Sequence, residues 1–335
     1  MMARYLVTGG AGFIGAALVR RLVREGHRVR VVDNLSRGSA TRLDEVTGEL
    51  EFITGDVRDA ETVLRAMRGV ERVCHLAFIN GTEFFYTRPE AVLEVGVKGM
   101  VNVLDACRAH RVRELLLVSS SEVYQVPPTV PTDETAPLSI PDPLNPRYSY
   151  AAGKIISELM AVNYGRTGFD RVLIARPHNV YGPDMGTEHV IPQFLLRMRE
   201  RCEDPEDPVP FPIQGSGKET RAFTFIDDCV EGLMTILARG AHLGIYHVGT
   251  TEELTIEAVA HLVAATFGRR IRVIPGEPRP GSAPRRCPDI RRLMALGYRP
   301  RVPFQEGLAL TAAWYREHGA RAPASPPAAL SRAAG

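Results

Sequence analysis

Short apolar runs alternate with amphipathic stretches along the first half of the chain. The apolar runs predict strands at residues 4–7, 29–32, 50–54, 72–76, 115–119 and 172–175. Between them, apolar residues recur with the period of a helix, and the predicted helices end near residue 24 and cover 60–68, 89–110 and 149–164. Strands that alternate with helices at this spacing indicate βαβ units and therefore a parallel sheet.

The pattern changes in the second half of the chain. Residues 177–221 hold many prolines and glycines, residues 222–245 return to a strand followed by a helix, and residues 246–320 mix short elements. We therefore expect an α/β protein in which residues 1–176, joined by 222–245, form a Rossmann-type doubly wound parallel sheet. Residues 177–221 and 246–320 are expected to form a smaller α/β substrate-binding domain.

The composition is that of an ordinary globular protein, with 44% hydrophobic and 24% charged residues and a net charge of +2. Such a charge gives no reason to expect nucleic acid or a membrane as a partner. The five cysteines form no C-x-x-C pair, which favours a reducing compartment. With no signal peptide and no long apolar run, we expect a cytoplasmic protein, and the Ala- and Pro-rich residues 321–335 are expected to be disordered.

Three glycines, Gly9, Gly12 and Gly15, follow the first predicted strand and open the first predicted helix. In this context glycines let backbone N–H groups approach a pyrophosphate at the positive end of the helix. The spacing is G-x-x-G-x-x-G, whereas many dehydrogenases have G-x-G-x-x-G. The loop predicts a bound dinucleotide.

Asp33 ends the second predicted strand, where a carboxylate can accept hydrogen bonds from the adenosine ribose. A carboxylate would repel a 2′-phosphate, so Asp33 favours NAD over NADP, although Arg37 nearby leaves NADP open. The alternative is that Asp33 only caps a turn. Asp56 follows another strand end and is a candidate contact for the adenine.

Tyr150 and Lys154 are four residues apart and so share one face of a predicted helix. The positive charges of Lys154 and of the oxidised nicotinamide would favour the Tyr150 phenolate. A phenolate can remove a hydroxyl proton while hydride leaves the same carbon. Such a pair is common by chance on surface helices, but the glycine loop upstream strengthens it.

The serines of 119–121 lie at the carboxyl end of a predicted central strand. Ligands of open α/β sheets bind at that edge, and a hydroxyl there can bond the reacting sugar oxygen. The alternative is a Ser-rich turn.

With these motifs in place, the chain resembles the extended short-chain dehydrogenase/reductases, specifically their sugar-nucleotide epimerase/dehydratase group. The resemblance runs from about residue 3 to residue 318 and includes the glycine loop and residues 33–38, 55–57, 75–77, 119–124, 150–154, 176–183, 215–228, 286–290 and 296–298.

The resemblance implies roles for individual residues. Ser120 matches the catalytic hydroxyl, Tyr150 the base and Lys154 its partner, which also binds the nicotinamide ribose. The remaining implied NAD contacts are Gly9, Gly12, Phe13, Ile14, Gly15, Asp33, Asn34, Asp56, Val57, Leu76, Ala77 and Pro177.

A nucleotide-diphosphate sugar is the implied substrate. The implied contacts are Ser121, Asn179 and Val190 for the nucleotide sugar and Arg221 and Arg286 for the diphosphate, a role that suits a charged fork. The group also implies a homodimer through the helices near 89–110 and 149–165.

Some residues depart from the group's pattern. Gly96 stands where Asn is usual and Met100 where Thr is usual, so a helix contact near the active site is expected to be lost. His178 stands where an aromatic residue is common, and Gln125 where glycine is common. Residues 80–85, near the expected sugar pocket, match no pattern.

Members of this group begin by oxidising C4 of a hexose, and they differ in the next chemical step. Glu122 resembles the Glu of dehydratases and decarboxylases, whereas Ser121 replaces the acid of many dehydratases and His189 replaces an Arg of decarboxylases. Alternatively, Glu122 only bonds a local backbone amide. We predict an NAD-dependent 4-epimerase that forms a transient 4-keto sugar, with a 4,6-dehydratase or a UDP-glucuronate-type decarboxylase as the alternative.

Two other classes remain open. A non-catalytic Rossmann protein that senses NAD(P) would not need Ser120, Tyr150 and Lys154 together. Asp33 counts against an NADP-dependent keto-sugar reductase.

Overall fold

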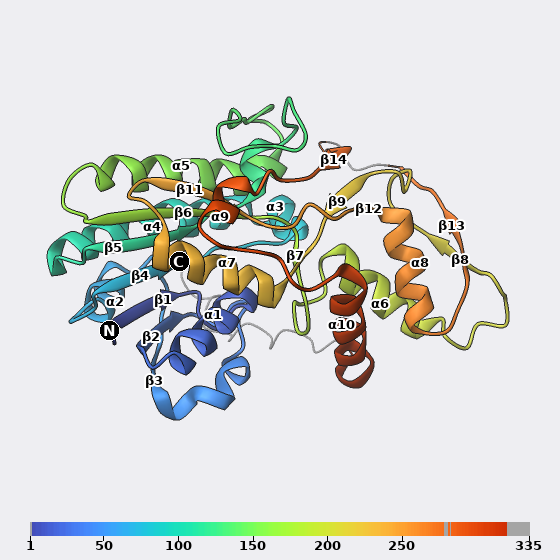
Figure 1. The fold of residues 1–335 in the computed structure, drawn as a ribbon, viewed down its shortest axis with the longest axis horizontal. Coiled ribbons are helices and arrows are strands. Elements are labelled where there is room, and N and C mark those ends of the chain that lie inside the picture. Colours follow the sequence, from blue (N-terminus) through green and yellow to red (C-terminus); the bar gives the residue numbers. More distant parts are fainter. Residues whose placement is uncertain (1, 278–280, 282, 320–335) are drawn as a thin grey trace, which may run out of the picture.

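The computed structural model describes residues 2–277, 281 and 283–319, and the predicted disordered tail lies outside them. A seven-stranded parallel sheet forms one end of the molecule (Figure 1). Its strand order is β3-β2-β1-β4-β5-β6-β11. The sheet strands are β1 (Arg4–Thr8), β2 (Arg28–Asp33), β3 (Leu50–Thr54), β4 (Arg72–His75), β5 (Glu114–Val118), β6 (Arg171–Pro177) and β11 (Gly244–Val248).

Helices cover both faces of this sheet because each strand sends alternate side chains to opposite sides. The covering helices are α1 (Phe13–Arg24), α2 (Ala60–Ala66), α4 (Pro89–His110), α5 (Ser149–Gly165) and α7 (Ile226–Arg239), with the short α9 (Arg291–Ala295) beside β11. Tyr5 and Val7 of β1 pack into the core beneath α1 and α7, whereas Leu6 packs into the core beneath α2, α4 and α5. This arrangement confirms the Rossmann-type α/β fold.

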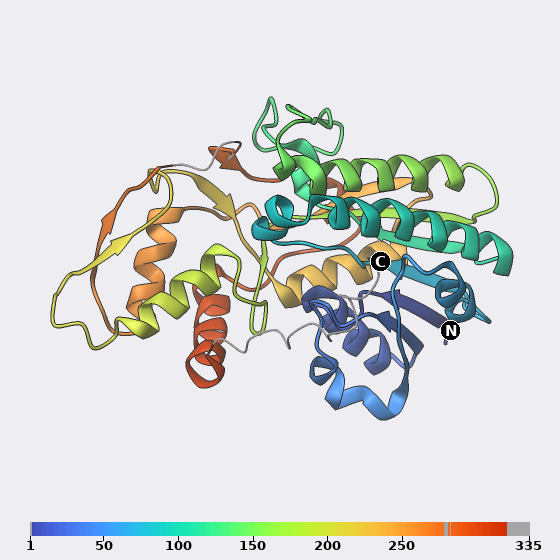
Figure 2. The same ribbon diagram turned by 180° about the vertical axis from the view of Figure 1, so that it is seen from behind.

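A smaller group of elements lies beyond the carboxyl ends of the strands (Figures 1 and 2). It has its own apolar core, which includes Phe194, Phe211, Val263 and Leu308. Its helices are α6 (Val190–Glu200), α8 (Ile256–Thr266) and α10 (Phe304–His318), and its short strands are β7 (Val180–Tyr181), β8 (Val209–Pro212), β9 (Thr220–Ala222), β10 (Thr224–Phe225), β12 (Glu253–Thr255), β13 (Ile271–Ile274) and β14 (Arg285–Arg286).

Several short elements were not anticipated from the sequence pattern. They are the 3-10 helices η1 (Ala40–Glu49), η2 (Ser121–Tyr124) and η3 (Pro146–Tyr148) and the helix α3 (Thr82–Thr87). Within the described ranges, no helix combines the length and apolar character that a membrane span requires.

A buried ion pair joins α5 to β6. The Nε and Nη2 groups of Arg176 donate to the two oxygens of the Glu158 carboxylate, at 2.9 and 2.5 Å, and the two side chains are only 3% and 4% exposed. Arg176 also donates to the Tyr124 hydroxyl. The pair fixes the helix that carries Tyr150 and Lys154 against the sheet.

Replacing Glu158 by alanine should lower the free energy of unfolding by about 3–5 kcal/mol, because it leaves a buried guanidinium without its counter-charge. Glu25→Ala is the control, since the Arg21–Glu25 pair on α1 is 39% and 38% exposed and should contribute less than about 1 kcal/mol. Urea unfolding measures both. Equal losses in the two variants would contradict the special role of the buried pair.

Candidate active site

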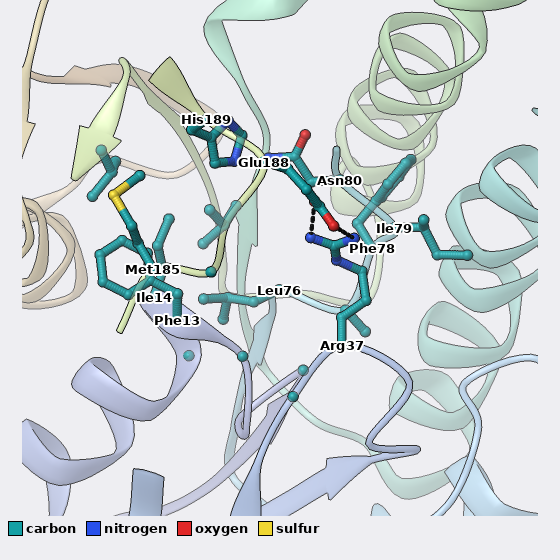
Figure 3. A pocket seen from close by; sticks show the side chains of 18 of the residues that line it. Phe13, Ile14, Arg37, Leu76, Phe78, Ile79, Asn80, Met185, Glu188 and His189 are labelled. Atoms are coloured by element: carbon teal, nitrogen blue, oxygen red, sulfur yellow. Dashed lines mark hydrogen bonds and ion pairs between the residues drawn. The ribbon is translucent and has the colours of Figure 1, made fainter. Parts of the chain in front are cut away.

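A cavity of about 960 Å³ lies at the carboxyl ends of β1, β2, β4, β5 and β6. One wall comes from the sheet and its loops, and the other from the segment 179–191 and the aromatic residues Trp314 and Tyr315. Figure 3 shows Phe13 and Ile14 on one side of the cavity and Phe78 and Asn80 on the other. This edge is where open α/β sheets bind their ligands.

The glycine loop leaves no space for side chains at two of its positions. A Cβ on Gly15 would lie 2.1 Å from the Gly9 carbonyl oxygen, and one on Gly9 would lie 2.7 Å from the Ala77 nitrogen. Gly9 also has φ +71°, a left-handed conformation that favours glycine. The amino end of α1 therefore opens directly into the cavity, where its free N–H groups can meet an anion. This cradle fits a dinucleotide pyrophosphate.

The Asp33 carboxylate lies at the end of β2, on the cavity wall. Its oxygens accept hydrogen bonds from the N–H groups of Ala11 (3.0 Å) and Leu35 (2.8 Å). Burial raises the pKa of this carboxyl and the two amides act against the rise. Asp33 is thus held rigidly between two loops rather than merely capping one turn.

Asn34 and Asp56 meet at the same edge of the sheet. The Asn34 amide donates to Asp56 at 2.9 Å, and Arg58 donates to both oxygens of that carboxylate, at 3.0 and 2.9 Å. Burial would raise the pKa of Asp56, but its bonds with Arg58 and Asn34 lower it overall. Val57, Leu76, Ala77 and Pro177 also line the cavity, as the sequence predicted for cofactor contacts.

Two ion pairs cross the cavity mouth. Arg37, in the loop after β2, forms a two-fold ion pair with Glu188 of the opposite wall (Figure 3). Its guanidinium also lies 4.5 Å from the centre of the Phe84 ring. Arg42 binds Asp184 at 2.8 and 3.0 Å. Arg37, which had kept NADP open, is therefore engaged by a carboxylate.

Ser120, Tyr150 and Lys154 lie together on the cavity wall. Ser120 follows β5, and Tyr150 and Lys154 lie in the first turns of α5. The Lys154 ammonium donates to the Val118 carbonyl at 2.8 Å and lies 5.8 Å from the centre of the Tyr150 ring. The structure thus brings the three predicted catalytic groups to one place.

Burial is the largest influence on the pKa values of Tyr150 and Lys154. It raises the pKa of the Tyr150 phenol, and interaction with the Ser120 hydroxyl partly offsets the rise. Burial also lowers the pKa of Lys154 to about 7, and the Glu158 carboxylate acts against that fall. A positive charge beside Tyr150 is therefore required before its phenolate becomes accessible near neutral pH.

Aromatic rings surround Tyr150. Phe85 of α3 stacks on its ring with centroids 5.0 Å apart and planes 22° apart, and Phe78 meets it edge-on, also at 5.0 Å. Asn80, Thr82, Phe84 and Phe85, from the segment that matched no pattern, thus form part of the cavity wall. The Phe78 ring also contacts Gly96, the position where the usual Asn is missing.

Glu122 is held by an arginine from the far end of the chain. Arg286 of β14 forms a bidentate ion pair with the Glu122 carboxylate, and one of its two hydrogen bonds measures 3.1 Å. Burial would raise the pKa of Glu122, but Arg286 first, then Arg147 and Arg221, hold it below its usual range. The alternative in which Glu122 only bonds a local backbone amide is therefore wrong.

The predicted substrate contacts are only partly gathered at the cavity. Ser121, Asn179 and Val190 line it, as does His189, which stands where decarboxylases have an Arg. Arg221 and Arg286 are not among the lining residues: Arg221 donates to the carbonyls of Thr220 and Ala283, and Arg286 faces Glu122.

Sequence patterns did not single out Arg147, Phe78 or Phe85, although all three line the cavity. Arg147 precedes Tyr150 by three residues, so it lies within one helical turn of it, and this spacing was an available signal. The contacts of Phe78 and Phe85 with Tyr150 depend on tertiary packing, so a single sequence could not predict them.

The comparison with sequence families agrees with this site. Residues 5–249 match the NAD dependent epimerase/dehydratase family. The chain is 30% identical to the UDP-N-acetyl-alpha-D-glucosaminuronate decarboxylase of Bacillus cytotoxicus, over 95% of this chain and 99% of the relative.

Solved structures give the same result. The dTDP-glucose 4,6-dehydratase of Streptomyces venezuelae, solved with NAD and TYD bound, has a TM-score of 0.83 and 34% identity, covering 94% of this chain and 97% of that one. The UDP-glucose 4-epimerase of Thermus thermophilus, in complex with NAD, has a TM-score of 0.81 and 34% identity, covering 94% of this chain and 99% of that one. The chain belongs to the NAD-dependent epimerase/dehydratase family of the extended short-chain dehydrogenase/reductases.

Proposed function

We propose that the protein is an NAD-dependent sugar-nucleotide 4-epimerase that works through a transient 4-keto sugar. The observation that carries the proposal is the arrangement of Ser120, Tyr150 and Lys154 on one cavity wall, beside a Glu122 that Arg286 holds in its ionised form. The first feature supports oxidation at C4, and the second argues against acid-catalysed loss of water afterwards.

The three polar residues divide the work at C4. The Ser120 hydroxyl bonds the reacting sugar oxygen and lies beside the Tyr150 phenol. The phenolate of Tyr150 removes the proton of the C4 hydroxyl as hydride leaves that carbon, and returns a proton when the ketone is reduced. The Lys154 ammonium stabilises the phenolate by its charge.

NAD supplies a reversible hydride acceptor when it is bound. We assign its pyrophosphate to the amino end of α1 at Gly9, Gly12 and Gly15, where side chains would collide with the backbone. The ribose hydroxyls would bond Asp33. A 2′-phosphate would meet that carboxylate, and the nearby Arg37 is already paired with Glu188, which supports selection of NAD over NADP.

Residues 121 and 122 bear on the possible second steps. A 4,6-elimination needs a base that takes the C5 proton and an acid that releases the C6 hydroxyl as water. Arginines keep Glu122 as a carboxylate, which could serve as the base but not as the acid, and Ser121 takes the position of the usual acid. A 4-epimerase needs neither group, because the keto sugar only turns over before the hydride returns.

Decarboxylation of a sugar-nucleotide uronate is the second candidate. The guanidinium groups of Arg147, Arg221 and Arg286 outnumber the carboxylates near them, those of Glu122 and Glu219, and so leave an excess of positive charge beside the site. That charge could bind either the substrate diphosphate or a C5 carboxylate. The similarity to the decarboxylase of Bacillus cytotoxicus supports the second use, whereas the neutral His189 does not.

A homodimer through α4 and α5 is proposed from the family resemblance. The two helices pack side by side along one face of the sheet (Figure 2), and Ile156 and Leu159 on α5 are exposed.

Tyr150→Phe should lower turnover by about 100- to 10,000-fold, because it removes the proposed base. NAD binding should change little, since the ring remains. Sugar-nucleotide turnover and NAD titration measure the two effects, with Tyr86→Phe on α3, an exposed tyrosine, as the control. Activity near that of the wild type would refute the assignment.

Asp33→Ala should weaken NAD binding and bring the NAD and NADP dissociation constants closer together, because the repulsion of a 2′-phosphate disappears. Adding Glu188→Gln should improve NADP binding further by freeing Arg37. Titration calorimetry with NAD and with NADP measures these dissociation constants in the wild type, the single variant and the double variant. An unchanged NAD/NADP ratio in Asp33→Ala would remove the proposed role.

Incubation of UDP- and dTDP-hexoses and uronates in D₂O, followed by NMR, separates the reactions. A 4-epimerase gives the C4 epimer without solvent deuterium, a dehydratase incorporates deuterium as the C6 methyl group forms, and a decarboxylase releases CO₂.

Glu122→Gln refines the same experiment. A 4-epimerase should keep most of its activity, whereas a decarboxylase or dehydratase should lose most of it. Melting temperatures control for the unpaired Arg286 in this variant. A large loss of activity in a folded variant would count against the 4-epimerase.

A further inference from the structure

Gly96 on α4 is a position where this chain lacks the usual polar side chain, and the Phe78 ring occupies the space. An ideal Cβ on Gly96 would lie 2.4 Å from Cζ and 2.6 Å from Cε2 of Phe78. Gly153 of α5 approaches the same ring, since its Cβ would lie 2.8 Å from Cζ. Even a methyl group at 96 therefore requires the ring to move.

The ring in this position contacts both members of the catalytic pair. The Lys154 ammonium nitrogen lies 4.1 Å from the centre of the Phe78 ring, well within the range of a cation–π interaction. The edge of the ring meets Tyr150 at a centroid distance of 5.0 Å and an interplanar angle of 81°. An aromatic face thus replaces part of the water that the buried ammonium has lost.

Among the residues that the structure describes, few other groups can stabilise that ammonium. Its one hydrogen bond within this set goes to the Val118 carbonyl. The carboxylate of Glu158, on the same helix, is already bound by Arg176 of β6. His75 of β4 is buried and its pKa is lowered to about 3, so it stays neutral.

We propose that Phe78, admitted by the absence of a side chain at Gly96, is a positioning residue that keeps Lys154 protonated and next to Tyr150. Its ring holds the ammonium from one side while the Val118 carbonyl holds it from another. The inference rests on the proposed roles of Tyr150 and Lys154. On this inference, Gly96 replaces the usual Asn because the Phe78 ring needs the space that a side chain at 96 would fill.

The chain allows a direct test because it contains only three lysines, Lys98, Lys154 and Lys218. Lysine labelled with ¹³C at Cε gives three NMR signals, and Lys98→Arg and Lys218→Arg identify the two exposed ones. The full-length protein with saturating NAD is titrated by pH. Phe78→Leu keeps the apolar contact but removes the π face, so the pKa of Lys154 should fall by about one unit.

Gly96→Ala should lower the pKa of Lys154 as well, because the methyl group displaces the ring. In the double variant Phe78→Leu/Gly96→Ala, the methyl group fits the space left by the ring, so the melting temperature should recover relative to Gly96→Ala. The pKa of Lys154 should nevertheless stay low, which separates the π face from packing.

Gly232→Ala is the matched control. It lies on α7, away from the cavity, and its Cβ would lie 2.6 Å from Val248. This substitution should cost stability while leaving the Lys154 pKa unchanged. In the activity arm, the rate of C4 oxidation at pH 8 should fall by up to about tenfold in Phe78→Leu and not in Gly232→Ala.

A Lys154 pKa that is the same in wild type, Phe78→Leu and the double variant would overturn the inference. That result together with an inactive Tyr150→Phe would overturn it while leaving the proposed function intact. Conversely, an active Tyr150→Phe would remove the proposed function, whereas a lowered Lys154 pKa in Phe78→Leu would still show that the ring sustains the charge.

Discussion

The contact between the glycine loop and the amino end of α1 is the constraint on which the rest of the site depends. A Cβ at Gly15 would lie 2.1 Å from the Gly9 oxygen, so only glycine lets the helix begin this close to β1. The helix then points its unpaired N–H groups at the edge of the sheet, where every neighbouring strand also ends. The cofactor cradle, Asp33 and the proposed catalytic residues consequently share one cavity.

Buried charge governs the chemistry open to this cavity. Burial lowers the pKa of Lys154 to about 7 and raises that of Tyr150, so it shifts both residues toward their neutral forms. Arginines, in contrast, keep Glu122 ionised. The protein therefore arranges counter-charges and aromatic rings around these three groups.

The fold and the cofactor cradle could be predicted because their causes are local. Apolar periodicity defines strands and helices, and Gly9, Gly12 and Gly15 follow a strand directly. Phe78 and the Arg286–Glu122 pair could not be predicted, since each depends on segments that meet only after folding. Gly96 was noticed as a lost contact, but one sequence could not show which side chain takes the space.

The strand order has a consequence for how this protein can be divided. The edge strand β11 pairs with β6, although half of the elements of the smaller group lie between these two strands in the chain. That group is thus an insertion within the sheet as well as a C-terminal extension. Replacing the substrate-binding elements by those of a relative would therefore require several junctions. A chain cut after β6 would lack β11, so the edge of β6 would be exposed, unpaired and prone to pair with another chain.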